Sequence, residues 1–142
     1  MEYRVCRNNP APYNDLNGKI SLLGLGTMRL PLRDAADQTS IDEEKAQEIF
    51  DYAYAHGVNY FDTAYSYHGG MSEKFCGKAL AKYPRASYHL ASKLPGWMLK
   101  CDEDVPRIFN EQLANCRTDY FDFYLAHSVH ESSWSNYAKY HA

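Results

Sequence analysis

Residues 57–67 read GVNYFDTAYSY, and they place the acid Asp62 at the end of a short apolar run. Asn59–Asp62 has the length and apolar character of a buried strand. The preceding segment, Ile41–His56, carries apolar side chains at helical spacing and acids in its first turn. Gly57 follows as a helix stop. The stretch therefore predicts a helix that ends, a tight turn and a buried strand.

The same alternation continues on both sides of this stretch. Further strands are predicted at Ser21–Gly26, Tyr88–Lys93 and Phe121–His127. Further helices are predicted at Ser72–Tyr83 and Asp102–Cys116, and a fourth begins in Ser132–Tyr140. The repeat is about 30 residues long, which is the size of a βα unit. Such alternation predicts an α/β fold with a parallel sheet and helices outside it.

Two α/β architectures compete for this pattern. A doubly wound nucleotide-binding fold requires a glycine-rich turn that leads from the first strand into a helix. Residues 24–29 read GLGTMR, without the third glycine, and Pro31 follows at once. We therefore favour the N-terminal half of a (β/α)8 TIM barrel, because a complete barrel needs about 250 residues and about four βα units are present.

The domain organisation that follows is a single domain over residues 1–142. Residues 1–20 form an N-terminal segment, in which the Asn17-Gly18 dipeptide of Tyr13–Ile20 favours a small β-hairpin before the first strand. Residues 21–142 supply βα units 1 to 4. The chain breaks off inside a helix-like segment, which favours a truncated form of a longer product.

Composition excludes several classes of protein. The chain is 45% hydrophobic and 23% charged, which fits a globular fold. A net charge of −3 without a basic stretch argues against nucleic acid or a membrane surface as partner. No apolar run approaches the roughly 20 residues of a membrane span, and the start MEYRVCRNNP shows no secretory signal. Four widely spaced cysteines without a CxxC pair predict reduced thiols in a cytoplasmic protein and no metal site.

Chemically capable side chains lie at or just past the C-terminal ends of the predicted strands. They are Asp62, Tyr67, Lys93 and His127. Each has an ordinary alternative: a turn cap for the acid, a solvent lysine, a satisfied core histidine, and one tyrosine among 13. In a (β/α)8 barrel, however, the active site lies at the C-terminal ends of the strands, so the shared position favours a catalytic group.

Several stretches together resemble one family. They are residues 57–67, Ser72-Glu73 and Gly77-Lys78-Ala79-Leu80, together with Leu23–Pro31, Ala91-Ser92-Lys93 and Asp119–His127. The combination resembles the signature of the aldo-keto reductases. Residues 67–70 (YHGG) and 109–113 (FNEQL) are similar to bacterial members that carry a ferredoxin-like cysteine cluster further along, and this chain lacks that cluster.

The resemblance implies reduction of a small-molecule carbonyl substrate by hydride from NADPH, with NADH as the other option. The family's catalytic residues fall on Asp62, Tyr67, Lys93 and His127. Tyr67 would donate the proton as general acid, and the Lys93 ammonium, paired with Asp62, would stabilise the phenolate. His127 would orient the carbonyl or share the proton transfer.

The resemblance also implies contacts around these four residues. Gly26, Thr27, Met28 and Asp62 would bind the cofactor. Trp97 would wall the substrate pocket, and a packed aromatic under the loop is the equal alternative. His68 and His130 are expected at the surface.

Three functional readings remain open. In the family, the second half of the barrel holds most of the cofactor, and four βα units leave two open sheet edges that favour self-association. The chain is then a truncated reductase with little activity of its own, an inactive half-barrel, or a regulatory protein that retains the fold. The four catalytic side-chain types favour the reductase over the regulatory protein.

Overall fold

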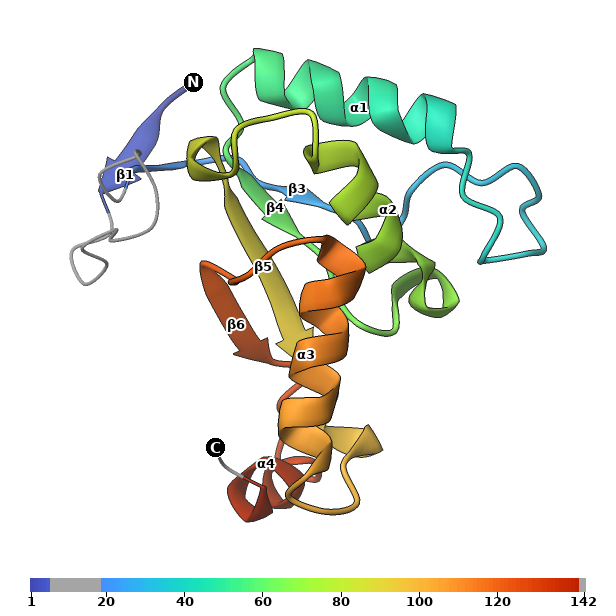
Figure 1. The fold of residues 1–142 in the computed structure, drawn as a ribbon, viewed down its shortest axis with the longest axis vertical. Helices are drawn as coiled ribbons and strands as arrows, with labels where there is room; N and C mark the ends of the chain where they lie inside the picture. Colours follow the sequence, from blue (N-terminus) through green and yellow to red (C-terminus); the bar gives the residue numbers. More distant parts are fainter. Residues whose placement is uncertain (6–18, 141–142) are drawn as a thin grey trace.

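The structure, a computed structural model, describes residues 1–5 and 19–140. Its main sheet has four parallel strands in chain order: β3 (Leu25–Gly26), β4 (Tyr60–Asp62), β5 (His89–Leu94) and β6 (Phe123–Ala126). Figure 1 shows these strands side by side, with β5 the longest. The predicted order and direction of the four strands are confirmed, and the architecture is a partial (β/α)8 barrel.

Helices alternate with these strands. They are α1 (Glu43–Ala55), α2 (Met71–Leu80), α3 (Asp104–Cys116) and α4 (Trp134–Lys139), with three short 3₁₀ turns, η1 (Tyr67–Gly70), η2 (Arg85–Ser87) and η3 (Gly96–Met98). In Figure 1, α1, α2 and α3 cover one face of the sheet. Each predicted helix is therefore present, with ends that differ from the prediction by at most three residues, as is usual for helix boundaries.

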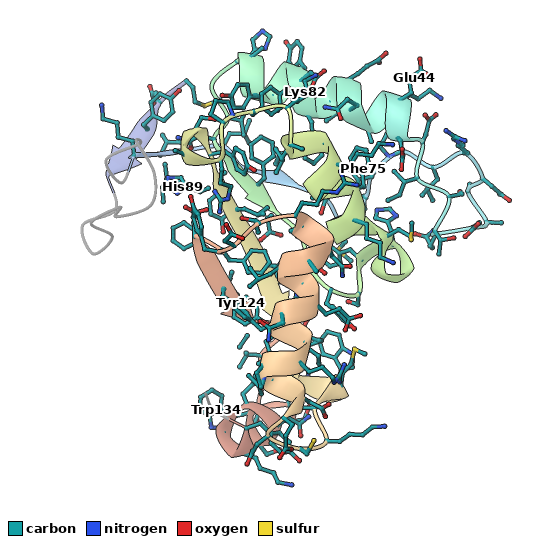
Figure 2. All side chains as sticks on the ribbon, viewed as in Figure 1. Glu44, Phe75, Lys82, His89, Tyr124 and Trp134 are labelled. Carbon is teal, nitrogen blue, oxygen red and sulfur yellow. The ribbon has the colours of Figure 1, made fainter. Side chains whose placement is uncertain are left out.

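The core lies between the sheet and the first two helices. Phe50 of α1 stacks on Phe61 of β4 at 5.3 Å between ring centroids and meets Phe75 of α2 edge-on at 5.5 Å. All three rings are buried, and Figure 2 contrasts the inward Phe75 with Glu44 on the outer side of α1. Alternation along β4 therefore sends Phe61 to the helices and leaves Tyr60 and Asp62 on the opposite face.

The first predicted strand, Ser21–Gly26, is wrong in its extent. Ser21 ends the short strand β2 (Lys19–Ser21), residues 22–23 bend, and only Leu25–Gly26 pair with β4. The Ser21 hydroxyl donates to Leu23 O at 2.7 Å, and the Ser21 N–H donates to Asn59 Oδ1 at 2.8 Å. These side-chain bonds replace the backbone ladder and turn the chain.

An antiparallel pair of short strands accompanies the parallel sheet. Strand β1 (Tyr3–Val5) pairs antiparallel with β2, while the Asn17-Gly18 turn proposed for it lies outside the described residues. The Lys19 carbonyl accepts from Asn59 Nδ2 at 3.1 Å and from His89 Nε2 at 3.0 Å. The pair is therefore tied to the residues that begin β4 and β5, at the end of the sheet opposite the strand C-termini.

Candidate active site

An ion pair joins the C-terminal ends of two neighbouring strands. Asp62 is the last residue of β4 and pairs in register with Ala91 of β5. Lys93 lies two residues beyond Ala91 on the same strand. Lys93 Nζ donates to Asp62 Oδ1 at 2.5 Å and to Thr63 O at 2.7 Å. The lysine side chain is only 12% exposed. A cation is therefore held, largely out of water, at the edge where barrel chemistry takes place.

Two further predicted residues lie beside this pair. Lys93 Nζ is 4.8 Å from the centroid of the Tyr67 ring, which opens the η1 turn after β4. The Tyr67 ring meets the His127 imidazole edge-on at 5.6 Å. His127 is fixed just past β6, because its N–H donates to Leu94 O at 3.0 Å. The fold thus brings Asp62, Tyr67, Lys93 and His127 together.

Trp97 borders the same group from η3. Its ring lies 5.0 Å from the His127 imidazole, centroid to centroid, and half of its surface is exposed. A packed aromatic would be covered, so the geometry leaves the indole free to touch a bound molecule. The side chain forms a wall beside His127.

The environment of His127 shifts its pKa. Burial, and then the Lys93 charge, lower the pKa of His127 below its ordinary value of 6.5. Within the described chain, His127 Nδ1 is the one buried side-chain polar atom that has no hydrogen-bonding partner. Buried polar atoms are nearly always paired in folded proteins. A neutral imidazole with an unused nitrogen suits a site that is completed by a ligand.

The residues expected to bind the cofactor occupy different positions. Thr27 is fully buried, and its hydroxyl donates to Asp62 O at 3.0 Å and contacts the Ser72 hydroxyl at 2.7 Å. Its side chain therefore serves to fasten β4 to α2. Gly26 and Met28 are exposed, and a β-carbon on Gly26 would meet nothing within 4 Å.

Two buried polar residues behind the site had no predicted role. Glu73 of α2 accepts from Ser92 Oγ at 2.6 Å, from Gln112 Nε2 at 2.6 Å and from Asn115 Nδ2 at 3.2 Å. Gln112 of α3 also donates to Lys93 O at 3.1 Å. The helical spacing indicates that Gln112 is buried, because it follows the core residue Ile108 by four positions and so lies on the same face of α3.

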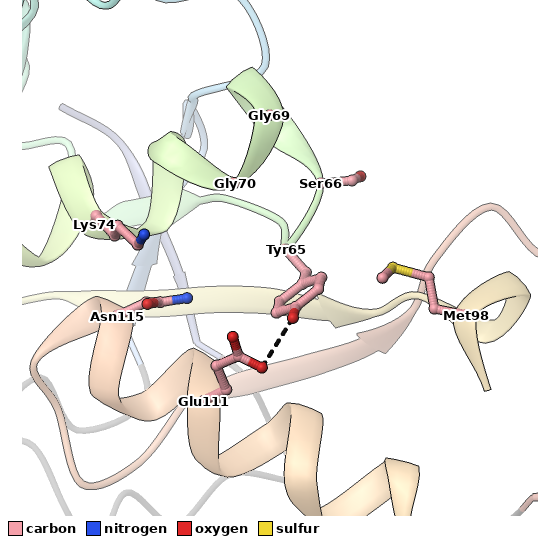
Figure 3. Close-up of a pocket in the computed structure, with 8 residues that line it drawn as sticks. All are labelled: Tyr65, Ser66, Gly69, Gly70, Lys74, Met98, Glu111 and Asn115. Carbon is pink, nitrogen blue, oxygen red and sulfur yellow. Dashed lines mark hydrogen bonds between the residues drawn. The ribbon is translucent and has the colours of Figure 1, made fainter. Parts of the chain in front are cut away.

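A separate pocket of about 370 Å³ lies between α3 and the segment that joins β4 to α2. Figure 3 shows Tyr65 donating a hydrogen bond to Glu111 Oε2, 2.9 Å away, with Lys74 and Met98 on the pocket walls. Burial and the Glu111 hydrogen bond raise the pKa of Tyr65. None of the four strand-end residues lines this pocket, so it is distinct from the candidate active site.

Two features are absent from the described ranges, 1–5 and 19–140. No group of three or more His, Cys, Asp and Glu side chains is placed to hold a metal ion. Every helix in these ranges is too short or too polar to span a bilayer.

Comparison with known proteins places this chain in a family. The sequence model of the aldo/keto reductase family matches residues 22–136. The chain belongs to the aldo-keto reductase family. Its similarity to L-galactose dehydrogenase of Arabidopsis thaliana is 31% identity over 116 residues, which cover 78% of this chain and 35% of that protein.

Solved structures agree with this assignment. Aldo-keto reductase AKR11C1 from Bacillus halodurans, in its holo form, is 31% identical with a TM-score of 0.65, covering 88% of this chain and 40% of that one. An aldo/keto reductase from Klebsiella pneumoniae in complex with NADP and acetate is 25% identical with a TM-score of 0.64, covering 87% and 42%. The chain thus spans about a third of the curated relatives' length and less than half of these two structures.

Proposed function

We propose that this chain supplies the catalytic half of an NADPH-dependent reductase of aldehydes or ketones. The observation that carries the proposal is the Lys93 ammonium, bonded to Asp62 and lying against the Tyr67 ring beside His127. Family membership adds support, because the same four residue types in the same order are those the family uses. The substrate is a small carbonyl compound.

The chain's own residues perform the proton chemistry in this proposal. Bound nicotinamide supplies the hydride. Tyr67 donates a proton to the developing oxyanion, and Lys93 stabilises the phenolate that remains. Asp62 keeps Lys93 charged in its partly buried position. His127, neutral near pH 7, offers a ring nitrogen to orient the carbonyl.

One feature of the structure fits a nucleotide at this edge. The surface over Gly26 is open to a close approach, because a β-carbon there would meet nothing within 4 Å. Gly26, Met28 and the Asp62 carboxylate would contact the cofactor, and Thr27 would act by fixing Asp62. NADPH is favoured over NADH by the relatives solved as NADP complexes, such as the Klebsiella pneumoniae enzyme.

The other reading is a non-catalytic half-barrel or a regulatory protein that keeps the fold. An inactive fold has no need to hold a lysine 12% exposed between a carboxylate and a carbonyl oxygen. Removing the lysine charge from water costs free energy, because the desolvation of a buried charge must be offset by well-placed partners. The ion pair therefore favours the reductase.

The test is oxidation of NADPH in the presence of an activated aldehyde. We expect the 142-residue chain alone to turn over negligibly, because positioning of the hydride donor contributes roughly 7–11 kcal/mol in well-oriented reactions. Extending the chain to the length of its relatives should restore turnover, and Tyr67→Phe should abolish it. Activity that survives Tyr67→Phe in the active form would refute the proposal.

We also propose that the open edges of the sheet bind a second copy of this chain. In the described chain β3 and β6 have no outer neighbour, and the parallel order lets β6 of one copy lie beside β3 of another. An apolar pocket of about 420 Å³ borders β3, with Leu23, Leu25 and Ile49 on its walls. Light scattering should show dimers that Ile49→Lys weakens, and a monomer at high concentration would refute this.

A further inference from the structure

The residue that follows Tyr67 is held in an uncommon backbone conformation. His68 has φ 53° and ψ 40°, in the left-handed region that a β-carbon disfavours. Gly69 and Gly70 follow with φ of 61° and 89°. His68 is only 6% exposed, so its expected surface position is wrong. Strain of this kind persists only where the surroundings impose it.

The His68 imidazole supplies that restraint through two hydrogen bonds. Leu30 N–H donates to His68 Nε2 at 3.1 Å. His68 Nδ1 lies 2.9 Å from Gln38 O, and because a carbonyl can only accept, Nδ1 carries the proton. Both bonds exist together only in the neutral ring protonated at Nδ1.

These bonds fasten η1 to one particular loop. Residues 28–41 follow Thr27 and begin with Met28, and a bridge between Leu32 and Ile41 closes this loop. The loop packs closely on η1 as well, since a β-carbon on Gly69 would lie 2.8 Å from Thr39 Cγ2. His68 therefore connects the loop beside the proposed cofactor surface with the turn that begins at Tyr67.

We propose that His68 is a positioning residue that holds the Tyr67 phenol beside Lys93 and His127 by locking η1 to the 28–41 loop. The inference rests on the proposed function only in treating Tyr67 as the proton donor. Two backbone hydrogen bonds of Tyr67 itself are local: its N–H donates to Ala64 O at 3.2 Å, and its carbonyl accepts from the Met71 N–H. The side chain one position later provides the long-range attachment, over 30 and 38 residues of sequence.

The first experiment determines the state of the ring. In the 142-residue chain labelled with ¹⁵N-histidine, the nitrogen shifts of His68 at neutral pH should report a neutral ring protonated at Nδ1. A ring protonated at Nε2, or a doubly protonated ring, is incompatible with the Leu30 bond and would overturn the proposal.

The second experiment separates positioning from stability. His68→Gly keeps the left-handed backbone and removes both hydrogen bonds, while His68→Asn keeps that backbone and a short amide that can donate to Gln38 O. Exposed His130→Ala is the matched control. We expect His68→Gly to speed exchange of the Leu30 amide at least tenfold and to remove the nuclear Overhauser contacts between the Tyr67 and His127 rings, with partial recovery in His68→Asn.

Unchanged ring contacts in folded His68→Gly would overturn the positioning role. In a form of the protein with Tyr67-dependent turnover, kcat should fall by roughly 10- to 100-fold with KM little changed, because a displacement of about 1 Å costs about 100-fold. Failure of the proposed function looks different: turnover would then be indifferent to Tyr67→Phe, while the Leu30 exchange and ring contacts would still report on His68.

Discussion

Lys93 Nζ donates to Asp62 Oδ1 at 2.5 Å, and the two residues join adjacent strands at the C-terminal edge of the sheet. Their side chains are 12% and 27% exposed, so solvent screens the pair only in part. We expect a double-mutant cycle of Lys93→Met and Asp62→Asn to give a coupling of about 1–3 kcal/mol in the free energy of unfolding in urea.

The matched control for this cycle is the ion pair of Lys78 and Glu43. Those side chains are 57% and 43% exposed, and exposed pairs are worth at most about 1 kcal/mol. Equal coupling free energies in the two cycles would show that the burial of the Asp62–Lys93 pair does not strengthen it.

Neutralising Glu73 should destabilise the chain strongly. The carboxylate accepts from Ser92, Gln112 and Asn115, and the Glu73 side chain has no exposed surface. In Glu73→Gln, an NH₂ group must face one of these donors, which leaves buried groups unpaired. We expect a loss of about 2–4 kcal/mol in urea unfolding. Glu44→Gln, on the exposed face of α1, should change stability by less than about 0.5 kcal/mol.

The alternation of strands and helices was predictable because it depends on short-range periodicity. Ile41–His56 contains α1, and the three strands after Gly57 pair in the predicted parallel order. The apolar character of Ser21–Gly26 led to a strand prediction that is too long, because Leu22 and Leu23 are not in a strand and are 52% and 61% exposed. The bend there depends on Asn59, 38 residues away, and no local pattern reveals that bond.

The candidate site likewise contains residues that local sequence could identify and residues that it could not. Asp62, Lys93 and His127 could be identified because each lies at or next to the C-terminal end of a strand, a position that topology fixes. His68 could not, since its burial depends on Leu30 and Gln38 of a loop that folds back over η1. Thr27 was expected to face a cofactor, and its hydroxyl is instead within hydrogen-bonding distance of Ser72. Side-chain direction at such positions is set by tertiary contacts.

His127 should titrate at a lower pH than an ordinary histidine. Burial and the Lys93 charge lower its pKa from 6.5 in the folded chain. The unfolded chain therefore takes up this proton first, and the stability contributed by neutral His127 is present above about pH 6.5 and is lost as the pH falls below it. An NMR titration should place the midpoint below 6.5, and Lys93→Met should raise it. A midpoint unchanged by Lys93→Met would contradict the assigned cause.

Replacement of Gly77 should disrupt the packing of α2 against α3. A β-carbon at this position would lie 2.6 Å from both Asn115 O and Cys116 C, and 2.8 Å from Cys116 O. These are backbone atoms of α3, which cannot move without displacing the helix that carries Gln112. Overpacking of this kind costs about 1–3 kcal/mol or more, so Gly77→Ala should lower the midpoint of urea unfolding even though alanine favours a helix.

Gly26→Ala is the matched control, because a β-carbon there meets nothing within 4 Å. If Gly77→Ala were as stable as Gly26→Ala, the close approach of the two helices would be wrong.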